Sequence, residues 1–122
     1  MTRTHASAKA AGTRLETAAA AHLAAWVDDR IERRARNGSK DRGDISGLRT
    51  PHGHRLVAEI KNTARATLAT WAAEAEVERG NDDALAAVVI HKRHGRGYIG
   101  AQWVTMTLDD LVAILTGTRP AS

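Results

Sequence analysis

Residues 43–62 read GDISGLRTPHGHRLVAEIKN, the most informative part of the chain for its fold. It contains two segments with strand character, 44–49 and 55–61. Between them, residues 50–54 combine proline, glycine and two histidines, a composition typical of a tight turn. We therefore predict two short neighbouring strands at this point of the chain.

Alternate residues of a strand face opposite sides of its sheet, and this alternation orders the side chains of 55–61. Glu59 and Lys61 fall on one face together with Val57. The opposite face is apolar and consists of Leu56, Ala58 and Ile60. An acidic and a basic side chain are thus expected side by side at the end of a buried strand.

A long helix is predicted before this stretch, over residues 12–36. Thr13 and Glu16 have the spacing of a capping box at its start, and Asn37-Gly38 is a stop signal at its end. Residues 1–11 are then a flexible N-terminal arm. The predicted buried stripe comprises Leu15, Ala19, His22, Leu23, Trp26, Val27 and Ile31.

Downstream, the pattern predicts a helix over 62–79 and a buried strand over 84–91. A basic loop follows, then a strand over 98–106 and a helix over 107–115. The order is helix, strand, strand, helix, strand, strand, helix. It predicts an α/β fold with a small central mixed β-sheet flanked by helices, in one domain over 12–122.

Composition narrows the function classes. Among 122 residues, 18 Lys and Arg outnumber 14 Asp and Glu, a formal net charge of +4 that favours polyanionic partners. There is no cysteine, which excludes disulfides, thiolate zinc sites and a cysteine nucleophile. No apolar run is long enough to span a bilayer, and no secretory signal is visible, so we expect a soluble, cytoplasmic protein without a membrane partner.

The core is expected to be thin, because the chain has no Phe, three Trp and one Tyr. Small domains with little apolar area to bury are often stabilised by association. We therefore expect a homodimer.

The residues with the clearest chemistry are Asp44 and Glu59, which neighbouring strands would bring together. Two carboxylates at a sheet edge are hard oxygen ligands suited to Mg²⁺. Lys61 would place an ammonium group beside them, to orient or deprotonate water or to neutralise charge on a phosphate. Glu16, from the first helix, could add a third carboxylate.

The series Gly12-x-x-x-Glu16, Asp44 and Glu59-Ile60-Lys61 resembles the PD-(D/E)xK nuclease superfamily, and most closely its archaeal-type and phage-encoded Holliday-junction resolvases. The resemblance covers roughly residues 12–115. It implies a restriction-endonuclease-like fold, with a metal held by Asp44, Glu59 and the backbone carbonyl of Ile60. It also assigns catalytic roles to Lys61 and Glu16.

The same resemblance implies a Mg²⁺-dependent endonuclease, with Mn²⁺ able to substitute. Such a homodimer would cut four-way DNA junctions symmetrically, leaving 5′-phosphates, in a bacterial host cell if the chain is phage-encoded. The sequence departs from the family at Gly43, where the motif has proline. Contacts to the DNA backbone are expected from Arg30, Arg33, Arg34, Arg36, Arg42, Lys92, Arg93 and Arg96.

Simpler interpretations remain for each residue. Glu16 could only cap its helix, Asp44 could be a turn residue, and Glu59 with Lys61 could be a surface ion pair. The basic residues could form a solvated face, and the paired histidines (His52, His54, His91 and His94) a zinc site, which we consider the weaker interpretation. Three rival functions follow: a nuclease for flaps, single strands or duplex ends, a catalytically silent DNA-binding protein, and a domain that binds no nucleic acid.

Overall fold

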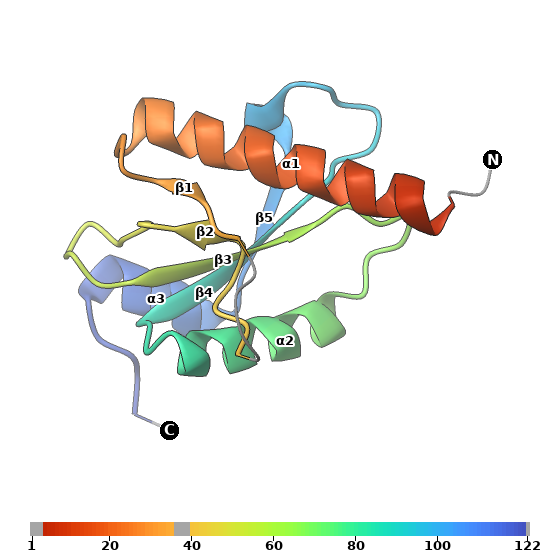
Figure 1. Ribbon diagram of the computed structural model, residues 1–122. Coiled ribbons are helices and arrows are strands. Elements are labelled where there is room, and N and C mark those ends of the chain that lie inside the picture. Colours follow the sequence, from red (N-terminus) through yellow and green to blue (C-terminus); the bar gives the residue numbers. More distant parts are fainter. Residues whose placement is uncertain (1–3, 36–39, 122) are drawn as a thin grey trace.

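The computed structural model describes residues 4–35 and 40–121 (Figure 1). In this part of the chain the helices are α1 (His5–Trp26), α2 (Leu68–Asn81) and α3 (Leu108–Thr116). The strands are β1 (Glu32–Arg33), β2 (Ile45–Ser46), β3 (Leu56–Lys61), β4 (Ala86–His91) and β5 (Trp103–Thr105), with a 3-10 turn η1 (Ile99–Ala101) before β5.

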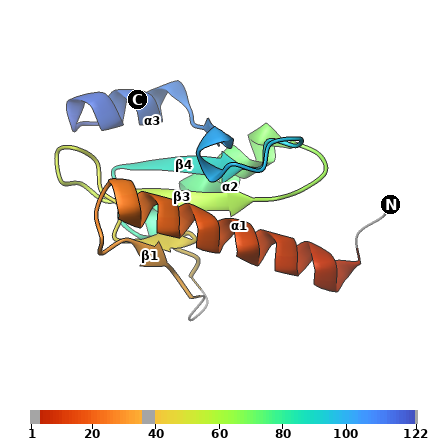
Figure 2. The same ribbon diagram turned by 90° about the horizontal axis from the view of Figure 1, so that it is seen from above.

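The main sheet has the strand order β3-β4-β5. β3 and β4 are parallel, whereas β4 and β5 are antiparallel, so the predicted mixed sheet in an α/β fold is confirmed. β1 and β2 form a small antiparallel hairpin beside β3. The N–H of Asp44 donates to the carbonyl of Ala58 (2.9 Å), which joins this hairpin to the main sheet. Viewed from above, the hairpin and α3 lie at opposite edges of the sheet (Figure 2).

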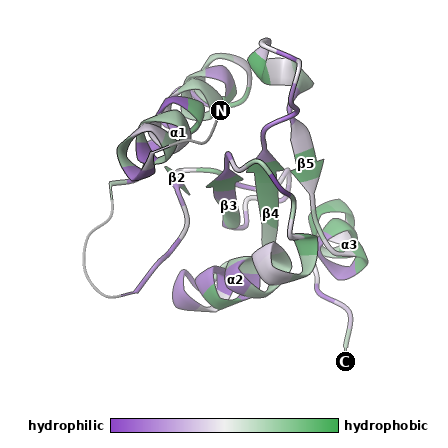
Figure 3. Ribbon diagram, turned by 90° about the vertical axis from the view of Figure 1, so that its right-hand side faces the viewer, coloured by the Kyte–Doolittle hydropathy of each residue, from purple (hydrophilic) through white to green (hydrophobic). Residues whose placement is uncertain are grey.

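Helices cover both faces of the sheet, and the alternation predicted for β3 explains how. Ala58 and Ile60 pack in a core cluster with residues of α1, whereas Val57 packs with Trp71 and Ala75 of α2. β4 is buried along most of its length, and Figure 3 shows it in the hydrophobic colour between the helices. Glu59 and Lys61 therefore point to the side that α2 covers.

The N-terminal prediction was wrong for residues 5–11, which belong to α1 and not to a flexible arm. Thr4 is the N-cap, and its side chain accepts a hydrogen bond from the N–H of Ser7 (3.0 Å). The capping box predicted at Thr13 and Glu16 therefore lies inside the helix. Ala and Lys between Ser7 and Gly12 are strong helix formers, and they extend the helix back to the first available cap.

The predicted end of this helix was also wrong. α1 stops at Trp26, residues 27–31 form a turn, and β1 follows and pairs with β2. Asp28 accepts hydrogen bonds from the N–H and guanidinium of Arg30, a local turn that competes with helix continuation. Trp26 is consequently 79% exposed, while Ile31 of the predicted stripe enters the core from the hairpin side. The predicted stop at residues 37–38, and Arg36, lie outside the described residues.

The remaining elements match the predictions in type and differ in their bounds. The strand predicted over 44–49 shortens to Ile45–Ser46. The helix predicted from residue 62 begins at Leu68, after a turn in which Thr63 donates to the carbonyl of Arg65. The predicted 98–106 strand shortens to β5. The cap predicted for the last helix is confirmed, since Thr107 accepts from the N–H of Asp110 (3.2 Å).

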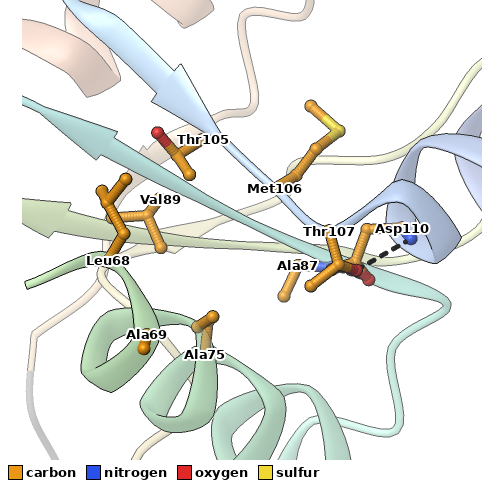
Figure 4. Close-up of a pocket in the computed structure, with 10 residues that line it drawn as sticks. Leu68, Ala69, Ala75, Ala87, Val89, Thr105, Met106, Thr107 and Asp110 are labelled. Atoms are coloured by element: carbon orange, nitrogen blue, oxygen red, sulfur yellow. Dashed lines mark hydrogen bonds between the residues drawn. The ribbon is translucent and has the colours of Figure 1, made fainter.

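An apolar cavity of about 230 Å³, partly open to solvent, adjoins the core (Figure 4). The cavity lies between α2, β4 and the start of α3, and its lining includes Leu68, Ala75, Val89 and Met106. Its one acidic residue, Asp110, is bound by Arg119 and by the N–H of Ala87. This cavity is therefore a packing feature with no free acidic group. No helix within the described ranges 4–35 and 40–121 is long and apolar enough to cross a membrane.

Candidate metal centre

Asp44 lies at the edge of β3, where the hairpin joins the main sheet. Its carbonyl accepts a hydrogen bond from the N–H of Arg34, and its own N–H donates to Ala58. Its Oδ2 atom accepts the N–H of Ile60 at 2.7 Å. Asp44 is buried, and these bonds fix both its backbone and its carboxylate against β3.

Glu59 is the second predicted acidic residue, and the structure brings it next to Asp44. Its charge is among the influences that raise the pKa of Asp44, so the two carboxyls interact electrostatically. Glu59 is only 4% exposed. Its Oε2 atom is buried and has no hydrogen-bond partner in the described part of the chain. The two carboxyls predicted to meet at a sheet edge do meet there.

Burial changes the acidity of these groups. It raises the pKa of Asp44 to about 7, and the charge of Glu59 adds to the shift. Burial also raises the pKa of Glu59 to about 8, with a further contribution from Glu78. Desolvation penalises the charged form of a carboxyl, and neighbouring carboxylates penalise it again. A cation bound between such groups would remove that penalty.

Lys61 follows on the same face of β3. Its Nζ atom lies 3.7 Å from Oε1 of Glu59 and 2.6 Å from Oε2 of Glu74 on α2. Burial alone would lower the pKa of Lys61. The hydrogen bond to Glu74 and the charges of Glu59 and Glu74 outweigh this effect, so the pKa lies above its ordinary value. Lys61 is thus a cation at neutral pH, held between the carboxyl groups of Glu59 and Glu74.

Glu16 lies on α1 and belongs to the electrostatic surroundings of Asp44, whose pKa its charge helps to raise. Its Oε2 atom accepts a hydrogen bond from Nε of Arg33 at 2.9 Å, an ion pair between α1 and β1. The capping role is excluded by its place inside the helix. Glu16 is therefore near Asp44, but its charge is already paired with Arg33.

Asp41 and Glu78 lie beside Glu59 and were not predicted from the sequence. Together with Asp44 and Glu59 they form what we call the acidic centre. Within the described residues, Asp41, Glu59 and Glu78 form a group whose carboxylate oxygens lie within 4.8 Å of one another and could hold a metal ion. Burial raises the pKa of Glu78 to about 7. Glu78 is 4% exposed, and its Oε2 atom is buried without a hydrogen-bond partner among the described residues.

A signal for Glu78 existed in the sequence. Trp71, Ala75 and Glu78 are spaced by four and three residues, so they fall on one face of a helix, and the first two are apolar. A carboxylate in line with a buried stripe is a candidate functional residue. Asp41 carried no comparable signal, because it stands in a polar loop. Its position depends on the side chain of Asn81, which donates to the carbonyl of Asp41 at 2.8 Å.

The arginines predicted at the end of the first helix are dispersed and mostly paired. Arg30 binds Asp28, and Arg33 binds Glu16. Arg34 binds Asp82 and the carbonyl of Arg42, which links the hairpin to the end of α2. The side chain of Arg42 is exposed. The described arginines of this group therefore lie after α1 and not at the end of a helix.

The second basic segment lies close to Lys61. A pocket of about 280 Å³ is lined by Lys61, Lys92, His94 and Trp103, among others. The guanidinium carbon of Arg93 lies 4.3 Å from the centre of the Trp103 ring, and Arg96 is exposed. Cations and an aromatic ring thus gather beside the acidic centre.

The four histidines considered as zinc ligands occupy separate environments. Nε2 of His91 lies 2.7 Å from the hydroxyl of Thr105, and Nε2 of His94 lies 2.8 Å from the carbonyl of Thr63. His52 contacts Gly117, and His54 is exposed. None of them belongs to the metal-compatible group found within the described residues.

No protein-family model, no curated protein and no solved structure that was compared with this chain matches it. The resemblance to the PD-(D/E)xK superfamily therefore rests on the residues of the site.

Proposed function

We propose that this protein is a metal-dependent DNA endonuclease with a restriction-endonuclease-like fold, and that its substrates are four-way DNA junctions. One observation carries the proposal: Asp44, Glu59 and Lys61, which come from two separate segments, converge at one end of β3. Two buried carboxyls beside a retained ammonium group suit hydrolysis of a phosphodiester, which needs an activated water and charge neutralisation.

The residues fit a divalent cation. Asp44, Glu59 and the backbone carbonyl of Ile60 would hold it. The N–H and C=O of one strand residue point to the same edge, and the N–H of Ile60 already points to Asp44. The unpartnered Oε2 of Glu59 offers a further oxygen. A bound Mg²⁺ or Mn²⁺ would supply Lewis-acid activation of water and neutralise phosphate charge.

In this scheme Lys61 acts as a positioned cation. Its raised pKa favours charge neutralisation at the scissile phosphate over proton abstraction. Glu74 orients the ammonium group through the 2.6 Å hydrogen bond. The neighbouring basic segment, Lys92 to Arg96, would contact the phosphates of the DNA strand that enters the site.

A homodimer fits the same function, because paired cuts in a junction need two active sites at a fixed separation. β5 is an edge strand, and its Trp103 and Val104 are exposed. Leu108, Leu111 and Leu115 on α3 are also exposed. This edge of the molecule is the apolar surface that we assign to the second copy.

The test is incubation of the purified protein with a labelled four-way junction and a matched linear duplex, with and without Mg²⁺. We expect paired, symmetric nicks in the junction alone, and only with the metal. Asp44→Asn and Glu59→Gln should each lower the cleavage rate at least ~100-fold, the scale of losing a group that stabilises charge in the transition state. Junction binding should persist, because the basic residues remain.

Asp109→Asn is the matched control, since Asp109 is an exposed acidic residue on α3. It should cleave at the wild-type rate. Cleavage of both DNAs would keep the site and reject the junction preference. Binding without cleavage by the wild-type protein would favour a silent DNA-binding protein. Equal cleavage by wild type and Asp44→Asn would reject the assignment of the site.

A further inference from the structure

The carboxylates of Asp41, Glu59 and Glu78 come from three different elements. Asp41 lies in the loop before β2, Glu59 on β3 and Glu78 near the end of α2. Their oxygens lie within 4.8 Å of one another. Asp44 is not in this group, and its carboxylate accepts the N–H of Ile60. The acidic centre therefore has two parts, Asp44 with Glu59 and the group of Asp41, Glu59 and Glu78, and Glu59 belongs to both.

On the α2 side, Glu78 shares side-chain hydrogen bonds with Glu59 and Asp41, but one oxygen of Glu59 and one of Glu78 lack partners. Oε2 of Glu59 and Oε2 of Glu78 are both buried and accept no hydrogen bond from the described residues. Both residues are only 4% exposed, so bulk water does not solvate them. Leaving a buried carboxylate oxygen unsatisfied costs more than leaving a neutral acceptor unsatisfied. A ligand of opposite charge would satisfy both oxygens.

The nearby basic side chains are engaged elsewhere. Lys61 makes its short contact with Glu74, Arg34 binds Asp82, and Arg33 binds Glu16. The ion pairs between described residues leave Glu78 without a basic partner. Glu59 and Glu78 therefore each carry a buried oxygen without a partner, and Lys61, 3.7 Å from Oε1 of Glu59, is the ammonium group beside them. Hard oxygen donors of this kind select divalent cations such as Mg²⁺ and Mn²⁺.

We propose that Asp41, Glu59 and Glu78 bind a divalent cation of their own, with Glu59 shared between this cation and the position at Asp44. This site goes beyond the proposed function, because its ligands Asp41 and Glu78 take no part in the scheme above. It also holds whether or not the protein cuts DNA.

The cation would tie three segments together. The carbonyl of Asp41 already accepts a hydrogen bond from Asn81, and its Oδ1 accepts the N–H of Gly43. A cation between Asp41, Glu59 and Glu78 would fasten this loop to both β3 and α2. Since the unfolded chain does not hold these carboxylates together, binding stabilises the native state.

The experiment measures thermal unfolding and the number of bound Mn²⁺ ions in the absence of DNA. Wild type is compared with Glu78→Gln and with the control Glu76→Gln. Glu76 lies on the same helix but pairs with Arg79 at the surface. Wild type and Glu76→Gln should show the same rise in Tm with Mn²⁺. Glu78→Gln should lose most of that rise and bind one ion fewer per chain.

Without metal, we do not expect Glu78→Gln to have a lower Tm than wild type. Glu78→Gln removes a buried acidic group, so its Tm without metal should equal or exceed that of wild type. An equal Mn²⁺ count and an equal Mn²⁺-dependent rise in wild type and Glu78→Gln would overturn the site. Asp41→Asn provides a second variant if Glu78→Gln does not fold, since its amide oxygen can still accept the Gly43 N–H. It should also lose the ion.

Asp44→Asn separates this inference from the nuclease proposal. It should abolish cleavage and yet retain the Mn²⁺ ion that depends on Glu78. A wild-type protein that cuts no DNA but binds Mn²⁺ through Glu78 would reject the nuclease and support the cation site. Cleavage with no Glu78-dependent ion would do the reverse.

Discussion

At the scale of single residues, the acidic centre is a set of carboxyl groups whose burial in the folded protein disfavours their charged form. Asp44, Glu59 and Glu78 all have a pKa raised well above the ordinary value, chiefly by burial. Near neutral pH the native protein therefore still holds protons that the unfolded chain has already released. This difference makes stability depend on pH and on metal.

The sign of that dependence follows directly. A carboxyl whose native pKa is raised contributes stability that is fully present below its unfolded pKa, which is about 4. The contribution is lost as pH rises through the native pKa, about 7 for Asp44 and Glu78 and about 8 for Glu59. In EDTA, we expect the free energy of unfolding to fall between about pH 6.5 and 8 and to level off at higher pH, where both states have lost these protons.

The lower limit of this range is set by His91. Burial lowers the pKa of His91, so its contribution is lost as pH falls below the ordinary value of 6.5 and is constant above it. Urea denaturation above pH 6.5 therefore measures the contribution of the carboxyls to the free energy of unfolding without a change from His91. Adding Mg²⁺ should reduce the fall, and Glu78→Gln should make it shallower, because Asp44 and Glu59 still titrate in that variant. Stability in EDTA that rises or stays level over the range would contradict the raised pKa values.

Part of the acidic centre could be predicted from the sequence. Asp44 and Glu59 were predictable as neighbours because strand alternation and a short turn bring them together. Asp41 and Glu78 were not, since their meeting depends on how a loop docks on α2. The pairing of Arg33 with Glu16 was equally hidden, because the predicted helix placed Arg33 on the same element as Glu16.

At the scale of elements, Gly43 explains the departure from the proline of the resembled motif. Its φ is +92°, in the left-handed region. Proline holds φ near about −65° and cannot adopt it. A Cβ at this position would lie 2.9 Å from Cγ1 of Val57 and 3.1 Å from the carbonyl oxygen of Ala58. The loop can therefore approach β3, and deliver Asp44 to it, only with glycine here.

Gly43→Ala should consequently lower the free energy of unfolding by about 1–3 kcal/mol, from backbone strain together with the close contact to β3. Gly53→Ala is a matched control, because Gly53 also has a positive φ of 85° but has open space around its Cβ position. Urea denaturation of both variants separates the strain from the contact. If the two variants lose equal stability, the close approach to β3 contributes nothing.

Some elements could be predicted from local sequence patterns, whereas the end of α1 could not. β3, β4 and α3 were predictable because burial and capping act locally on them. The end of α1 was not, because residues 32–33 leave the helical pattern to pair with β2 across the intervening loop. Helix periodicity in the sequence continued past that point, and a tertiary contact overrode it.

At the scale of the whole molecule, one edge of the sheet is apolar and exposed. β5 ends the sheet, and α3 beside it exposes leucines, among them Leu108, which is 74% exposed. A small domain with a thin core gains stability when such a surface is covered. An exposed edge strand also offers unpaired backbone groups to a second chain.

Leu108→Asp should therefore convert a dimer into a monomer, with little change in the stability of the monomer fold because Leu108 is exposed. Val77→Asp is the control, since Val77 is an exposed apolar residue on α2, outside this edge. Light scattering coupled to size-exclusion chromatography measures both masses. A wild-type monomer, or a dimer unaffected by Leu108→Asp, would reject this surface as the interface.

The hydrogen bond between Ile60 and Asp44 has a spectroscopic consequence. The N–H of Ile60 ends on a side-chain carboxylate at 2.7 Å, where a neighbouring strand would usually provide a carbonyl. Its amide proton resonance therefore responds to the charge state of Asp44. One cross-peak in a ¹H–¹⁵N spectrum thus serves as a native sensor, which shifts when Asp44 gains a proton or exchanges it for a cation.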